Sequence, residues 1–164
     1  MDDKNALLIH DLAAIAYRTQ KALRGAPPGF ASFRAASNVR TPHELVGHMD
    51  SVLGYACTFF VGGDYRVPPM PEFDAEISRF HVTISRLADL IAKETDWRAV
   101  TPEQLLQGPL ADALTHAGQL AMLRRLAGHP VAPENFVFAD VRASNLGPDQ
   151  PMPVSPDEEW PERP

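Results

Sequence analysis

The sequence predicts an all-α protein, built as an antiparallel four-helix bundle with an irregular C-terminal tail. Apolar residues recur at intervals of three and four along four stretches, at about residues 4–23, 41–60, 71–94 and 111–128. This spacing is the period of amphipathic helices, and no stretch alternates apolar and polar residues as a half-buried strand would. Four such helices bury their apolar faces against one another, which favours a bundle.

Capping residues mark where two of the helical segments begin. Thr41 is placed to cap a helix, Pro42 suits its first position, and Glu44 can close a capping box. The segment 101–104, Thr-Pro-Glu-Gln, repeats this pattern and predicts one short turn, which Gly108-Pro109 should interrupt before the last helix. Helix ends are expected at the glycines and prolines of 25–29, 62–63 and 128–130.

The chain has 164 residues, which suits one domain with a core of its own. We expect that domain to span 1–147 and a proline-rich tail to span 148–164. Phe136, Val137 and Phe138 are expected to dock, while the last fifteen or so residues lack periodicity and should be mobile. The long connection that ends at residue 40 is expected to rim a pocket.

Composition excludes several classes of function. A formal net charge of -6 argues against sequence-independent nucleic-acid binding, which needs a basic surface. No apolar run approaches the roughly 20 residues of a membrane span, and the acidic start differs from a secretory signal, so we expect a cytoplasmic protein. The single cysteine, Cys57, lies in an apolar helix and is expected to be a core thiol.

Three side chains form a candidate metal site. Asp112 and His116 are four residues apart on the last helix, so they share one face. Gln119 follows close to the same line, where it is expected to hold and orient a ligand or a bound water. His48 lies on the apolar face of the helix that begins at Pro42. A buried imidazole needs hydrogen-bond or metal partners, and the neighbouring sequence offers none to His48.

Other interpretations of these residues stay open at this stage. A histidine on an apolar helix face is commonly a satisfied core residue, and an Asp-His pair is commonly a surface ion pair. His81 is a reserve ligand or pocket residue, and Tyr55 is a candidate pocket residue. No glycine-rich phosphate loop, serine nucleophile elbow or cysteine pair is present.

Three motifs in order resemble the DinB-like, or YfiT-like, family of metalloenzymes. They are VRTPHELVGHM, EFDAEISRFH and GPLADALTHAGQLAMLRRLAG, and the resemblance covers roughly residues 30–128. It implies an up-down-down-up four-helix bundle that holds a divalent metal through one histidine of the second helix and two histidines of the last. When this pattern is carried over to the present sequence, the ligands are His48, Asp112 and His116. Asp112 stands where the family carries a histidine.

The resemblance also implies a chemistry. Two imidazoles and a carboxylate suit zinc or non-haem iron, and nickel and manganese stay open as well. Relatives include thiol-dependent S-transferases and isomerases, so the resemblance implies an S-transferase that uses a small thiol co-substrate, or a related hydrolase or isomerase. It also implies a homodimer. The alternative is a non-enzymatic, dimeric helical-bundle stress or binding protein with a degenerate metal site.

Overall fold

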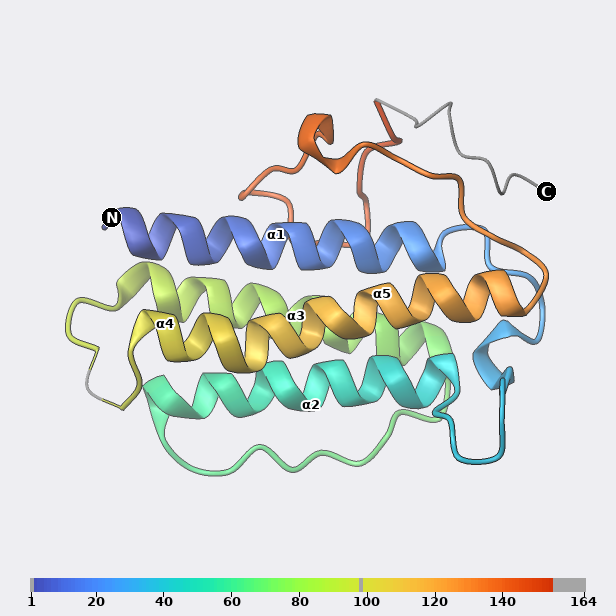
Figure 1. Cartoon of the computed structure of the whole chain (residues 1–164). Helices are drawn as coiled ribbons and strands as arrows, with labels where there is room; N and C mark the ends of the chain where they lie inside the picture. Colours follow the sequence, from blue (N-terminus) through green and yellow to red (C-terminus); the bar gives the residue numbers. More distant parts are fainter. Residues whose placement is uncertain (1, 98, 155–164) are drawn as a thin grey trace.

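The computed structural model describes residues 2–97 and 99–154, and they form a helical bundle (Figure 1). No β-strand occurs in that part of the chain, so the all-α prediction is confirmed. The long helices are α1 (Asp3–Leu23), α2 (Pro42–Val61), α3 (Phe73–Lys93) and α5 (Ala111–Leu126). The short elements are η1 (Phe30–Ser32), α4 (Pro102–Leu105), η2 (Leu106–Leu110) and η3 (Phe136–Phe138).

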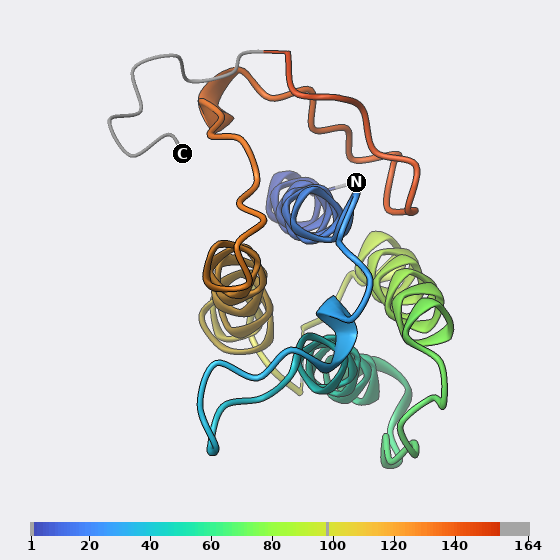
Figure 2. The ribbon, with the colours of Figure 1, turned by 90° about the vertical axis from the view of Figure 1, so that its right-hand side faces the viewer.

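The four long helices stand at the corners of a square when viewed from the end of the bundle (Figure 2). Both α1 and α2 contact α3 and α5, and α1 lies diagonally opposite α2. Between α2 and α3 the chain runs back along the outside of the bundle, from one end to the other (Figure 1). The helices α2 and α5 are therefore neighbours, which the candidate site requires.

Both predicted helix starts are confirmed. The Thr41 side chain accepts a hydrogen bond from the Glu44 amide, and the Glu44 side chain accepts one from the Thr41 amide. The same capping box joins Thr101 and Gln104 at the start of α4. The hydrogen bonds of a capping box join residues within one helical turn, so they form largely independently of the tertiary packing.

The predicted interruption at Gly108-Pro109 is wrong. The helix α4 continues through η2, a π-helical turn with Pro109 inside it, directly into α5. Proline has no amide to donate to the carbonyl four residues earlier, and its ring clashes there in a regular α-helix. In η2 the Ala111 amide instead reaches the Leu106 carbonyl, five residues back, so the wider turn accommodates the proline. Asp112 follows in the first turn of α5.

The core fills the space between the four helices with leucine, isoleucine, methionine and phenylalanine. Leu12, Met49, Phe80 and Leu120, one from each long helix, are fully buried. Leu126, near the end of α5, is 57% exposed and lies outside this core.

The connection from residue 62 to 72 is held against α2 and α3 by a polar network that the sequence did not predict. The Tyr65 ring packs closely against Gly54, where a Cβ atom would be 2.2 Å from the ring. The Tyr65 hydroxyl donates to buried Asp50 at 3.0 Å. Glu76 accepts from a backbone amide of the connection at 2.7 Å, and Arg79 donates to a backbone carbonyl there at 2.7 Å.

The segment after α5 folds back over α1. Phe136 lies under the Arg18 guanidinium, 3.6 Å from its carbon to the ring centre, as expected for a docked residue. Glu134 is buried and accepts a hydrogen bond from the Tyr17 hydroxyl at 2.6 Å. Val137 and Phe138 are 83% and 64% exposed, so the prediction that they dock is wrong.

Part of the predicted tail, 148–164, also contacts α1. Gln150 is buried, and its backbone carbonyl accepts a hydrogen bond from Arg24. The expected mobile end falls largely on residues 155–164, which lie outside the described residues.

Candidate metal centre

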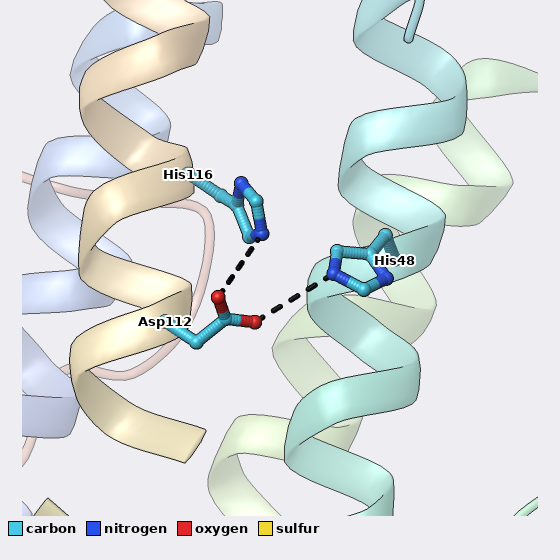
Figure 3. A group of neighbouring side chains, drawn as sticks. All are labelled: His48, Asp112 and His116. Carbon is cyan, nitrogen blue, oxygen red and sulfur yellow. Dashed lines mark ion pairs between the residues drawn. The ribbon is translucent and has the colours of Figure 1, made fainter. Parts of the chain in front are cut away.

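The helices α2 and α5 bring His48, Asp112 and His116 together in one His-Asp-His cluster (Figure 3). The three side chains each offer one ligand atom, and these atoms all lie within 4.8 Å of one another. Asp112 stands between the imidazoles, with Oδ1 3.4 Å from Nε2 of His116 and Oδ2 3.6 Å from Nε2 of His48. The spacing of four on α5 therefore does place both side chains toward the same partner helix.

The cluster runs from the interior to the surface. The side chain of His116 is 9% exposed, that of His48 is 31% exposed, and that of Asp112 is 46% exposed. A ligand bound here would be anchored in the bundle on one side and reach solvent on the other.

The buried imidazole of His116 turns a lone pair toward the carboxylate. Its Nδ1 lies 3.0 Å from Oε1 of Gln119. A carbonyl oxygen only accepts, so in the neutral ring Nδ1 carries the proton and Nε2 carries none. Nε2 is buried without a hydrogen-bond partner although Asp112 is 3.4 Å away. Two electron-pair donors that face each other without a proton favour a cation between them.

Electrostatics keep His48 in the form that binds metals. Burial holds the pKa of His48 below its ordinary value, Arg40 and His116 act in the same direction, and Asp112 opposes them. An imidazole must be neutral to donate its lone pair to a metal. At neutral pH His48 is therefore ready to act as a ligand.

The other predicted site residues divide between this cluster and other places. Gln119 joins the cluster through His116. His81 is not brought there: its Nδ1 donates to the Leu146 carbonyl at 2.7 Å, and its Nε2 lies 3.3 Å from the Gln20 side chain. His81 thus fastens the C-terminal segment to the bundle.

Two hollows flank the cluster along α5. One, of about 550 Å³, is lined by Asp112 and by Tyr55, which is 56% exposed. The other, of about 650 Å³, lies between residues 35–40 and α5 and is lined by Arg40 and Gln119. The expectation that the long connection rims a pocket is confirmed. Arg40 was not predicted as a site residue, and its only sequence signal is its place just before the helix-start motif at Thr41.

Comparison of the chain with models of known protein families, with curated proteins and with solved structures found no match. None of the helices in the described part of the chain combines the length and the apolar character needed to cross a membrane. The chemistry of the cluster itself therefore carries the functional argument.

Proposed function

We propose that this protein is a metal-dependent enzyme of the DinB-like class, in which His48, Asp112 and His116 hold one divalent metal ion. The observation that carries the proposal is the unpartnered, buried Nε2 of His116 beside the Asp112 carboxylate. The return of the chain along the bundle between α2 and α3 supports the up-down-down-up topology that the resemblance implies (Figure 1).

The spacing of the three side chains suits a metal. Zinc-ligand distances of about 2.0–2.2 Å in a tetrahedron separate neighbouring ligand atoms by roughly 3.4 Å. Oδ1 and Oδ2 of Asp112 lie 3.4 Å and 3.6 Å from the imidazole nitrogens of His116 and His48, and the three ligand atoms all lie within 4.8 Å of one another. Small side-chain rotations would complete the set, and three protein ligands leave a position for a substrate. Zinc, iron, nickel and manganese all accept two imidazoles and one carboxylate.

The residues of the chain have separate tasks in this proposal. Gln119 holds the proton on Nδ1 of His116 and so keeps Nε2 available. The half-exposed Asp112 supplies negative charge where the cluster reaches solvent. A bound divalent metal would lower the pKa of a coordinated thiol, which makes that thiol a nucleophile at neutral pH. The two flanking hollows give a thiol and an acceptor separate places, which supports a thiol-dependent S-transferase.

Metal content tests the first step. Protein purified without chelator is expected to contain a single metal ion per chain, measured by elemental analysis. His48→Ala, Asp112→Ala and His116→Ala should each lose most of it, whereas His10→Ala, which changes an exposed histidine of α1, should keep it. Wild-type protein that binds no stoichiometric metal from zinc, iron, nickel or manganese would exclude the proposal.

Activity separates the enzyme from a degenerate binding protein. The metal-loaded protein is expected to join small thiols to electrophilic substrates faster than the His116→Ala variant does. Equal rates for the two proteins would favour the non-enzymatic alternative. We also propose a homodimer, which sedimentation of the purified chain tests directly.

A further inference from the structure

The second hollow beside the cluster has the size of a small-molecule site. It encloses about 650 Å³ between the segment 35–40 and the last turns of α5, which is within the usual range of ligand pockets. Its lining is formed by Ala35, Asn38, Val39, Arg40, Leu45, Gln119, Met122, Leu123 and Leu126. We call it the Arg40 cavity.

The Arg40 cavity lies beside the His-Asp-His cluster, although none of the three cluster residues lines it. Gln119 lines it, and the same side chain bonds His116. Arg40 also lines it, and its positive charge acts on His48. Gln119 and Arg40 thus link this cavity to both imidazoles of the cluster, so a ligand held there would lie next to the proposed metal site.

One end of the cavity is cationic. Arg40 makes no hydrogen bond or ion pair with any described residue, unlike Arg34 nearby, whose guanidinium contacts both carboxylate oxygens of Glu44 at 3.1 Å. Arg40 is exposed at the rim of the cavity, so its guanidinium is free to contact a ligand there. Arginine recognises carboxylates through paired, charge-assisted hydrogen bonds.

The lining also includes apolar side chains that are open to solvent. Met122 and Leu126 are each 57% exposed, and Val39 is 38% exposed. Covering such side chains with an apolar ligand is favourable by roughly 25 cal/mol for each Å² removed from water. A flexible methionine also adapts to ligands of different shapes.

We propose that the Arg40 cavity binds a carboxylate-bearing substrate with an apolar body, whose carboxylate contacts Arg40 and whose body covers Met122 and Leu126. This inference deepens the proposed function and rests on it, because it places an acceptor substrate beside the proposed metal. It does not require any metal ligand to change its protonation state.

Calorimetric titration with octanoate and with octanol tests the proposal on the full chain. The two probes share an apolar chain and differ in the carboxylate. Wild-type protein should bind octanoate about tenfold or more tightly than octanol, given the usual strength of a charge-assisted hydrogen bond. Arg40→Gln should lose that preference, and Arg66→Gln, which changes an exposed arginine outside the cavity, should keep it.

Zinc titration of the same proteins distinguishes this inference from the proposed function. Arg40 is not a ligand, so Arg40→Gln should bind zinc as the wild type does. Octanoate that fails to bind, or binds Arg40→Gln as tightly as wild type, would overturn the cavity proposal even if zinc binds. Charge-selective binding of octanoate without zinc binding would uphold the ligand class and refute the metal function instead.

Discussion

Substitution of Gln119 tests how the protein prepares His116 for a metal. The hydrogen bond of 3.0 Å between Gln119 Oε1 and His116 Nδ1 fixes the proton on the nitrogen that faces away from Asp112. Removing the hydrogen-bond partner of a metal-binding histidine weakens metal affinity by about tenfold to a hundredfold, or roughly 1.4–2.7 kcal/mol. Gln119 is exposed, so water can replace part of its effect. We therefore expect Gln119→Ala to weaken zinc binding by about tenfold, the lower end of that range.

A competition titration with a chromophoric chelator measures this affinity. Gln119→Glu should bind zinc at least as tightly as wild type, because a carboxylate accepts a stronger hydrogen bond from Nδ1. Gln107→Ala is the matched control, since Gln107 is exposed on the π-helical turn next to α5 and its side chain makes no hydrogen bond with a described residue.

Nitrogen NMR of the metal-free protein reads the proton position directly. The expected spectrum has the His116 proton on Nδ1 in wild type and a mixture of tautomers in Gln119→Ala. The reasoning is refuted if wild type carries the proton on Nε2, or if Gln119→Ala binds zinc within about twofold of wild type.

Three further predictions concern the ligand set, packing and pH. Asp112→His should still bind zinc at neutral pH, but chelator titrations should show a steeper loss on acidification, because three imidazoles rather than two must stay deprotonated. Gly54→Ala should lower the free energy of unfolding by roughly 1–3 kcal/mol in urea, because the new Cβ meets the Tyr65 ring. Burial holds the pKa of His81 below its ordinary value of 6.5. The unfolded chain therefore binds more protons below about pH 6.5, so acidification should destabilise wild type more than His81→Gln, as urea unfolding at several pH values would show.

Matched variants make these outcomes decisive. Gly118→Ala is the control for Gly54, because a Cβ there meets nothing within 4 Å, and it should stabilise α5 by roughly 0.5–1 kcal/mol. His10→Gln, at an exposed position, should leave the acid destabilisation in place. A Gly54→Ala protein as stable as wild type would contradict the packing of Tyr65. A His81→Gln protein with the wild-type pH dependence would contradict the assignment to His81, and zinc binding lost entirely in Asp112→His would contradict the interchange of ligands.

Local chemistry explains the predictions that succeeded. The capping boxes at Thr41 and Thr101 involve contacts within three residues of chain, so sequence alone determines them. Helical periodicity likewise placed Asp112 and His116 on one face of α5 and His48 on the inner side of α2. The pairing of those two faces followed from the resemblance of the motifs, since periodicity does not say which helices are neighbours.

Tertiary contacts decided the rest. Asp50 and Glu76 are acidic residues on helical faces, and their complete burial is tolerable because the 62–72 connection and Arg79 of α3 supply polar partners to both. The segment after α5 docks through Glu134 and Phe136, whose partners lie more than a hundred residues earlier.

For the candidate site, sequence determined which residue types stand on each helix, because backbone geometry and apolar spacing are local properties. The structure added which ring nitrogen of His116 contacts Gln119, although these residues are only three apart on α5. Only the folded structure decided that Arg40 stands in a cavity beside the cluster. That feature depends on the distance between the segment 35–40 and α5, which lie far apart in the chain, and no local pattern of residues encodes it.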